Sequence, residues 1–328
     1  MKAAMKAATV GAQGLEFTER PIPLVGPQDV LVRVQAAALN RADLTVLAGQ
    51  RHGAASGLGT VMGNEWAGVV DAVGAQVTRF QVGERVMGTG SGAMAEFVAV
   101  DQGRVMHLPS PSWTAVSASC YPMALNTMHD ALITHGQLQA GQSVLIQGAS
   151  SGVGLMGLHI AKWRGAAVII GSSTQADKRA RLSEFGASLA VDNQDPAWVE
   201  QVLAATQGRG VDLIVDQLAG RVANQNLAAT AILGRIVNVG RLAGTQGNFD
   251  FDLHALRRIH YIGVTFRTRS KDEVAAITAA MQRDLFPALA QGGFEMPIDQ
   301  VFAWRDLPAA YERMRSNQHF GKIAVEVQ

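Results

Sequence analysis

The sequence is poor in cysteine and carries no excess of charge of either sign. Its 328 residues include one cysteine, Cys120, so an internal disulfide and a metal site built from several thiolates are both excluded. A lone thiol is typical of a reducing compartment, and we therefore expect a cytoplasmic protein. The 28 Lys and Arg residues balance 27 Asp and Glu residues, which provides no basic surface for nucleic acid.

Charged residues are missing altogether from residues 136–161, a length that raises the question of a membrane span. Glycines, serines and glutamines interrupt this stretch, which favours a strand, a turn and a buried helix instead. The first residues, MKAAMKAATVG, lack the continuous apolar stretch of a signal peptide and predict a first strand. We expect neither membrane insertion nor secretion.

Short β-branched runs alternate with helix-like stretches from about residue 142 onward. The runs are VLIQ (144–147), AVII (167–170), LAV (189–191), VDLIV (211–215), RIVNV (235–239) and YIGVTF (261–266). Strands that alternate with helices predict a doubly wound parallel sheet with both faces covered. The sequence therefore predicts an α/β cofactor domain over residues 121–267.

The remaining sequence has a different character. Residues 1–120 are rich in Gly and Val and contain turn signals such as LVGPQD, which predicts a mostly β domain. A helical segment at 271–290 leads into QVFAW, a short amphipathic helix and the closing strand GKIAVEV. We expect residues 268–328 to complete the first domain.

A glycine-rich turn, GASSGVG at 148–154, follows the run VLIQ and precedes an apolar helix. Strand, glycine turn and helix is the context of a dinucleotide fingerprint, because small residues let backbone N–H groups approach a pyrophosphate. Ala149 and Ser151 stand where the strict pattern has its first two glycines, and Gly154 matches the third. The predicted cofactor contacts are Ala149, Ser150, Ser151, Gly152, Val153 and Gly154. The alternative is an ordinary strand-to-helix turn.

The end of the second run lacks the acidic residue that accepts hydrogen bonds from the ribose of NAD. The chain has Ser172 and Ser173 there, followed by Lys178, Arg179 and Arg181. Hydroxyls and cations attract a 2′-phosphate, which a carboxylate would repel, so we predict NADPH as the cofactor, with Ser172, Ser173 and Lys178 as ligands. A solvated helix face is the alternative interpretation, and it suits Arg181 better than Lys178.

These motifs together resemble the medium-chain dehydrogenase/reductase superfamily, and within it the zinc-independent quinone oxidoreductases and related enoyl reductases. The resemblance spans nearly the whole chain and rests on ALNRAD (38–43), GNEWAGVV (63–70), VTRFQVGERVMG (77–88), LQAGQSVLIQGASSGVG (138–154), IAKWRGA and FGKIAVEV. It implies a GroES-like catalytic domain, a Rossmann cofactor domain and a homodimer joined through the strand read as YIGVTF.

The same resemblance bears on metal binding. Asn40 and Asn64 stand where zinc dehydrogenases carry a Cys and a His ligand, and one cysteine cannot supply a structural zinc lobe. The eight histidines show no i, i+4 pair; they are His52, His107, His129, His135, His159, His254, His260 and His319. We therefore expect no metal, and an ion-paired or turn-bonded role for Glu65.

The reaction implied by the resemblance is hydride transfer from NADPH to a quinone or to the C=C bond of an α,β-unsaturated carbonyl compound. Its candidate catalytic residues are Asn40, Arg51, His52 and Asn64. Related enzymes carry a tyrosine about eleven residues after the Asn40 position, where this chain has Arg51 and His52. Two alternatives stay open: Asn40 caps a helix that has Asp43 in its first turn, and Arg51 with His52 lies on a surface loop.

The resemblance adds further cofactor residues, which are Thr127, Asn193, Val239, Gly240, Phe266 and Lys322. A Thr127 hydroxyl bonded to its own helix backbone is the alternative for that residue. A short-chain dehydrogenase is excluded because no Tyr is followed four residues later by Lys. A non-catalytic NADPH-binding or scaffold protein, and an enoyl-thioester reductase, remain as alternatives; in each case the expected ligands are small molecules.

Overall fold

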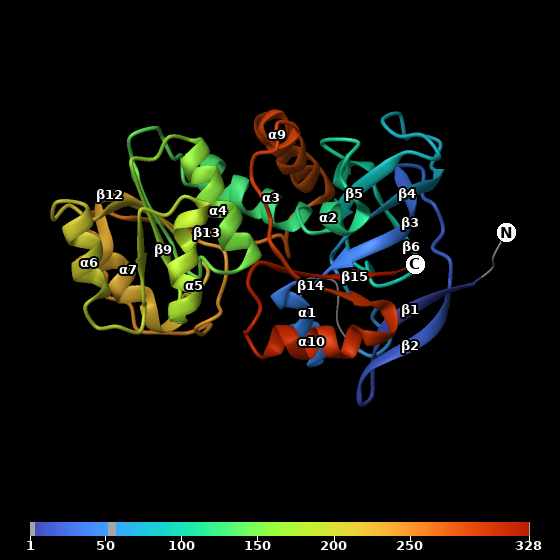
Figure 1. Cartoon of the computed structure of the whole chain (residues 1–328), viewed down its shortest axis with the longest axis horizontal. Helices are drawn as coiled ribbons and strands as arrows, with labels where there is room; N and C mark the ends of the chain where they lie inside the picture. The colour runs from blue at the N-terminus through green and yellow to red at the C-terminus, as the bar shows by residue number, and fades with distance from the viewer. Residues whose placement is uncertain (1–3, 52–56, 328) are drawn as a thin grey trace. The chain divides into compact units, whose positions relative to one another are not determined.

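Residues 4–51 and 57–327 are described by the structure, a computed structural model, and they divide into two units (Figure 1). One unit combines Met1–Met123 with Phe266–Gln328, and the other is Ala124–Thr265. The sequence placed the corresponding limits at about 120 and 267. Each unit has its own sheet and its own core.

Unit 124–265 contains a six-stranded sheet with the order β10-β9-β8-β11-β12-β13, in which all neighbouring strands are parallel. The strands are β8 (Ser143–Ile146), β9 (Val168–Ser172), β10 (Leu189–Val191), β11 (Val211–Asp216), β12 (Thr230–Asn238) and β13 (His260–Gly263). This is the strand order of a Rossmann fold, and it confirms the predicted doubly wound sheet.

Helices precede the first strand of this sheet and connect its successive strands. They are α3 (Pro122–His129), continued by a π-helical segment (Asp130–His135), α4 (Gly152–Trp163), α5 (Ala176–Arg181), α6 (Trp198–Ala205), α7 (Ala223–Ala229) and α8 (Phe251–Arg257). Their apolar side chains meet those of the strands in a core that includes Trp198, Ile214 and Ile236. The charge-free stretch 136–161 forms β8, the glycine turn and most of the buried helix α4.

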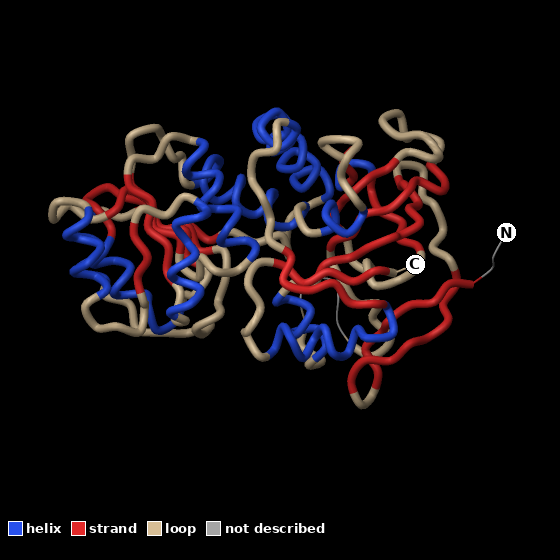
Figure 2. Tube along the Cα trace, in the orientation of Figure 1, coloured by secondary structure: helices blue, strands red, loops and turns tan. Residues whose placement is uncertain are grey.

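Unit 1–123 with 266–328 is built around a mostly antiparallel sheet, with the order β14-β15-β3-β4-β5-β7 and with β6 also paired to β3 (Figure 2). A separate hairpin joins β1 to β2. The strands are β1 (Ala4–Gly11), β2 (Gly14–Pro21), β3 (Asp29–Ala38), β4 (Glu65–Val73), β5 (Arg85–Thr89), β6 (Phe97–Asp101), β7 (Val105–His107), β14 (Ile298–Ala303) and β15 (Lys322–Glu326). The sheet confirms the mostly β, GroES-like prediction.

The C-terminal segment completes this sheet, because β15 pairs antiparallel with β3 and places Ala324 opposite Ala38. The helices of the unit are α1 (Arg41–Leu47), α2 (Ala115–Ser119), α9 (Lys271–Ala290) and α10 (Leu307–Arg315). Helix α9 begins at a capping box in which the Ser270 hydroxyl accepts from the Glu273 N–H at 3.2 Å and Glu273 accepts from the Ser270 N–H at 2.7 Å. No helix in the described part of the chain is long and apolar enough to cross a membrane.

Candidate functional site

Asn40 and Asn64 lie beside the ends of two paired strands in the mostly β unit. Asn40 follows β3 and is the N-cap residue of α1, and the Asp43 carboxylate accepts from its backbone N–H at 2.8 Å. The capping interpretation is therefore confirmed. Asn64 immediately precedes β4, which pairs with β3, so the two amides arrive at the same end of two neighbouring strands.

A buried ion pair lies beside Asn40. Glu65 has no exposed surface and Lys322 is 4% exposed, and the Lys322 ammonium donates to Glu65 Oε1. It also donates to the Leu39 carbonyl at 2.9 Å and to Asn40 Oδ1 at 3.0 Å, which uses all three N–H donors of an ammonium. Lys322, predicted to contact the cofactor, thus has its donors engaged inside its own unit. Glu65 is ion-paired, as expected.

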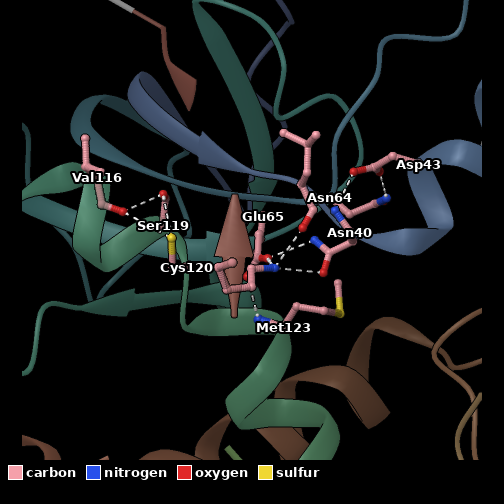
Figure 3. Close-up of polar contacts among 10 residues, drawn as sticks. Asn40, Asp43, Asn64, Glu65, Val116, Ser119, Cys120 and Met123 are labelled. Atoms are coloured by element: carbon pink, nitrogen blue, oxygen red, sulfur yellow. Dashed lines mark hydrogen bonds and ion pairs between the residues drawn. The ribbon is translucent and has the colours of Figure 1, made fainter. Parts of the chain in front are cut away.

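The pair fixes the orientation of the Asn40 amide (Figure 3). Asn40 Nδ2 donates to Glu65 Oε1 at 2.8 Å, while Oδ1 accepts from Lys322. The second Glu65 oxygen accepts from the Met123 backbone N–H at 2.9 Å. Asn40 is only 9% exposed, and its amide is bonded to both members of the ion pair. One of its two Nδ2 hydrogens is left for another partner.

Asn64 is the more accessible of the two amides. It is half-buried, and its Nδ2 donates to Asp43 Oδ1 at 2.8 Å. Asp43 is 1% exposed, and this burial raises the pKa of its carboxyl to about 7. The Asn40 N–H, the Lys322 charge and the Asn64 amide each lower that pKa, whereas the Glu65 charge raises it. Burial outweighs them because ionised carboxylates are costly to remove from water.

Cys120 lies in the same region and is fully buried (Figure 3). Burial raises the pKa of its thiol to about 12, so the sulfur stays protonated at neutral pH. Within residues 4–51 and 57–327, no three His, Cys, Asp or Glu side chains are placed to hold a metal ion together.

The other two predicted catalytic residues follow α1. Arg51 is exposed, four residues beyond the end of that helix at Leu47. His52 lies outside the described residues. Their roles stay predictions.

The glycine turn lies between β8 and α4 in the Rossmann unit. Ser151 is the N-cap of α4, and its hydroxyl accepts from the Gly154 N–H at 3.0 Å and donates to the Gly148 carbonyl at 3.0 Å. A Cβ on Gly154 would come within 2.6 Å of both the Ala149 Cα and the Gly148 carbonyl oxygen. The third glycine of the fingerprint is thus required for helix-to-turn packing, as the pattern predicts.

Ser172 occupies the carboxyl end of β9 and is buried. Its hydroxyl donates to Gln147 Oε1 at 2.6 Å and accepts from the Gly148 N–H at 3.0 Å and from Asn193 Nδ2 at 3.2 Å. Ser172 therefore links the ends of three strands, and its single O–H is already engaged. Ser173 is close to the glycine turn, because its hydroxyl lies 3.1 Å from the Ser150 hydroxyl.

The three predicted cations after β9 are placed differently. Lys178 is buried in α5, whereas Arg179 donates to Asp192 at 2.9 Å and to the Ser173 carbonyl at 2.8 Å. Arg181 is exposed and lies 3.5 Å from Glu184, as suits a solvated helix face. The Arg179 guanidinium thus pairs with Asp192, the residue that follows β10.

Sequence reasoning missed two residues that follow β11. Gln217 donates to the Gln147 and Gly148 carbonyls at 2.9 and 3.2 Å and accepts from Ser151 at 3.3 Å, which fixes the glycine turn. Arg221 donates to Asn193 Oδ1 at 3.1 Å. Their position after the carboxyl end of a central parallel strand is a signal that the sequence already contains.

The remaining predicted cofactor residues are spread over the chain. Val239 and Gly240 follow β12, and their N–H groups donate to the Asp216 carbonyl at 2.8 and 3.2 Å. Thr127 is half-buried in α3, and Phe266 is half-buried at the first residue of the returning C-terminal segment. Their contacts with a cofactor stay predictions.

Comparison with known proteins matches both units. A family model described as the alcohol dehydrogenase GroES-like domain covers residues 26–110, and one described as zinc-binding dehydrogenase covers residues 152–283. Two solved structures are similar over almost their whole length. A candidate alcohol dehydrogenase from Sinorhizobium meliloti 1021 is 30% identical, with a TM-score of 0.82 and coverage of 99% of each chain. A quinone oxidoreductase from Pseudomonas syringae pv. Tomato DC3000 is 26% identical, with a TM-score of 0.87 and coverage of 98% of this chain and 99% of that one.

Much longer proteins also contain a similar segment. A highly reducing polyketide synthase of Penicillium crustosum is 29% identical over 338 residues, which is 99% of this chain and 14% of the synthase. The chain thus spans about one seventh of the length of this curated relative.

Proposed function

This chain is an oxidoreductase of the medium-chain dehydrogenase/reductase superfamily, and we propose that it uses NADPH, without a metal, to reduce a quinone or the C=C bond of an α,β-unsaturated carbonyl compound. The proposal concerns the cofactor, the acceptor and the absence of metal chemistry. Similarity to a quinone oxidoreductase supports the acceptor class.

The observation that carries the metal-free proposal is the Lys322–Glu65 ion pair. Asn40 and Asn64 stand where the zinc enzymes that the chain resembles have two of their ligands, and the Lys322 ammonium is bonded directly to Asn40 Oδ1 at 3.0 Å. A divalent ion at this place would meet the fixed positive charge of Lys322 and two neutral amides, while the nearby Glu65 carboxylate is already paired with that ammonium and the Asp43 carboxylate already accepts from the Asn40 N–H and from Asn64. Such a donor set does not suit zinc, which prefers thiolate, imidazole and carboxylate ligands.

The chain's own residues then have to stabilise the negative charge that develops on the acceptor oxygen. A bound nicotinamide cofactor supplies the hydride. Asn64 is half-buried, and toward the described residues its Nδ2 uses one of two hydrogens, in the bond to Asp43. The second hydrogen is available to an acceptor oxygen, and a preorganised donor of this kind contributes about 2.7–4 kcal/mol to the transition state.

The cofactor proposal rests on the Rossmann unit. Its glycine turn leaves no room for a side chain at Gly154, the hydroxyls of Ser150 and Ser173 lie 3.1 Å apart, and Asp192 is paired with Arg179. These groups fit a dinucleotide with an additional 2′-phosphate. We expect NADPH to bind more tightly than NADH in fluorescence titrations at one ionic strength; tighter binding of NADH would refute the cofactor assignment.

The acceptor is tested by anaerobic NADPH oxidation with quinones, short enones and enoyl thioesters, followed by product analysis. Asn64→Ala should lower kcat/KM about 100-fold, because one oxyanion donor is removed. Asn248→Ala replaces an exposed asparagine in the other unit and should leave turnover unchanged. Equal turnover of Asn64→Ala and wild type would refute the role of Asn64.

Metal independence requires its own measurement. The purified protein should contain no stoichiometric zinc by elemental analysis, and chelator treatment should not change its turnover. Zinc at one equivalent together with chelator-sensitive turnover would contradict the proposal.

Similarity to reducing polyketide synthases favours a second candidate, the reduction of an alkene activated by a thioester. The chain lacks tyrosine throughout residues 1–120, so no phenol from this segment can donate a proton to a thioester enolate. Water can protonate a reduced quinone, and this difference favours quinones and reactive enones. If NADPH binds but no acceptor oxidises it, the non-catalytic binding alternative replaces both candidates.

A further inference from the structure

We propose that Arg221, which follows β11, determines cofactor specificity by binding the adenosine 2′-phosphate of NADPH. The inference rests on the proposed NADPH dependence and assigns it a residue outside the segment after β9. It starts from the hydrogen bond, 3.1 Å long, that joins the Arg221 guanidinium to Asn193 Oδ1.

A buried carboxylate holds the backbone that leads to Arg221. Asp216 is the last residue of β11, and its Oδ1 accepts from the Leu218 N–H at 2.8 Å and from the Ala219 N–H at 3.0 Å. Ala219 has φ 54° and ψ −149°, a conformation that is costly for a residue other than glycine. Such strain persists only where the surroundings enforce it, so this loop presents Arg221 in a defined direction.

Close packing fixes the loop from its other side. Gly220 has φ +46°, and a Cβ on it would come within 2.6 Å of the Ala243 carbonyl oxygen. The loop after β11 and the loop after β12 therefore touch at this glycine. Arg221 is the middle residue of the short 3-10 helix Gly220–Val222.

The hydrogen bond between Arg221 and Asn193 joins the loop after β11 to the residues after β10, at the carboxyl ends of these strands. Asn193 follows β10, and its Nδ2 donates to Ser172 Oγ at 3.2 Å at the end of β9. Arg221 is thus connected through one side chain to the strand end where a Rossmann fold receives the adenosine ribose. Residues from β9, β10 and β11 meet here, although they are up to 49 positions apart in sequence.

Arg221 is also chemically suited to the task. It is exposed, and Asn193 accepts from only one of the two terminal nitrogens of its guanidinium, Nη2. A guanidinium binds phosphate through two parallel N–H···O bonds, and it has no comparable partner in the 2′-hydroxyl of NADH. Arg179 pairs with the Asp192 carboxylate, and Arg181 lies against the Glu184 carboxylate. The hydrogen bond of Arg221 goes to a neutral amide, that of Asn193.

The test compares Arg221→Ala with wild type by fluorescence titration of NADPH and NADH and by competition with 2′,5′-ADP and 5′-AMP. Loss of a charge-assisted contact should weaken NADPH and 2′,5′-ADP roughly 10- to 100-fold and leave NADH and 5′-AMP within about twofold. Arg221→Lys should retain part of the preference, because it keeps the charge and loses the two-pronged geometry. Arg181→Ala is the matched control and should change neither cofactor.

The outcomes separate this inference from the proposed function. Wild-type preference for NADPH that survives Arg221→Ala, or an equal loss of NADPH and NADH affinity, overturns the role of Arg221 and leaves NADPH dependence standing. A wild-type protein that prefers NADH overturns both. If Arg221→Ala does not fold, Arg221→Gln removes the charge and keeps a shorter polar side chain with an N–H donor, and the same ratio of affinities decides.

Discussion

At the residue scale, the Lys322–Glu65 pair is a buried ion pair that also holds the Asn40 amide. Both charges are removed from water, and each has hydrogen-bond partners beyond the other: Leu39 and Asn40 for the ammonium, Met123 for the carboxylate. A buried pair of this kind is sensitive to the loss of one partner, because the remaining charge stays buried and uncompensated.

We predict that Lys322→Met lowers the free energy of unfolding by about 3–5 kcal/mol, measured by urea denaturation. The double variant Lys322→Met with Glu65→Gln should recover part of that loss, because it removes both charges. Arg315→Met, which breaks an exposed pair with Glu312, should cost no more than about 1 kcal/mol. A Lys322→Met protein as stable as wild type would contradict the buried pair.

Asp43 predicts a pH dependence of stability. Its pKa is about 7 in the folded protein and near 3.8 without burial, so the folded state binds the additional proton between these values. The free energy of unfolding therefore falls as pH rises from about 4 to 7, by up to about 4 kcal/mol from this group. The side chain of Asp43→Asn cannot titrate. The free energy of unfolding of the wild type minus that of the variant should therefore decrease as pH rises over that window. A difference that is constant or grows with pH would contradict the assignment.

At the element scale, the packing of α4 requires glycine at position 154 but not at position 157. A Cβ on Gly154 meets backbone atoms at 2.6 Å, whereas the nearest atom to a Cβ on Gly157 is the Met128 sulfur at 3.0 Å, on a flexible side chain. Backbone cannot move aside as a methionine can. Alanine is intrinsically the better helix former at both positions. Packing therefore decides whether a Gly→Ala substitution raises or lowers the stability of the protein.

We expect Gly154→Ala to destabilise the protein by about 1–3 kcal/mol through overpacking and to weaken NADPH binding. Gly157→Ala, on the same helix, should change stability by less than about 1 kcal/mol, because the gain in helix propensity offsets the displaced methionine. Thermal denaturation and cofactor titration of the two variants measure the difference. Equal effects of both substitutions would show that the contact at Gly154 does not govern the turn.

At the scale of the whole molecule, β13 is an edge strand that pairs only with β12 in the described chain. Apolar side chains are exposed nearby, including Phe251 at 75% and Tyr261 at 37%. Unpaired strand edges invite pairing with another chain, and a second copy related by a twofold axis satisfies both edges at once. This placement supports the homodimer that the family resemblance implies.

We predict that light scattering reports twice the chain mass of 34.7 kDa. Ile262→Lys on β13 should shift the protein toward the monomer, because a charge on an edge strand opposes pairing. Val82→Lys, an exposed position in the other unit, is the control and should leave the mass unchanged. A monomeric wild type at working concentration would refute the homodimer.

The sequence by itself determined the features that depend on neighbouring residues or on composition. The six alternating runs predicted the six parallel strands, and the helix expected at 271–290 is α9. Hydrophobic periodicity and glycine turns depend on residues close together in the chain, so they can be recognised from the sequence alone. The single cysteine likewise excluded a metal site built from several thiolates without any structure. Strand ends were less certain: the run at 261–266 forms β13 only over His260–Gly263, where pairing with β12 ends.

Only the tertiary structure decided which distant side chains meet. Glu65 and Lys322 are 257 positions apart, and they pair because β15 returns to the sheet beside β3, next to the strand that begins at Glu65. Arg221 reaches Asn193 across two intervening strands because β10 and β11 run parallel, which places their carboxyl ends at the same end of the sheet. The raised pKa of Asp43 follows from burial among these elements. Sheet order and burial are properties of the folded chain, since side-chain contacts and desolvation between remote segments leave no local pattern in the sequence.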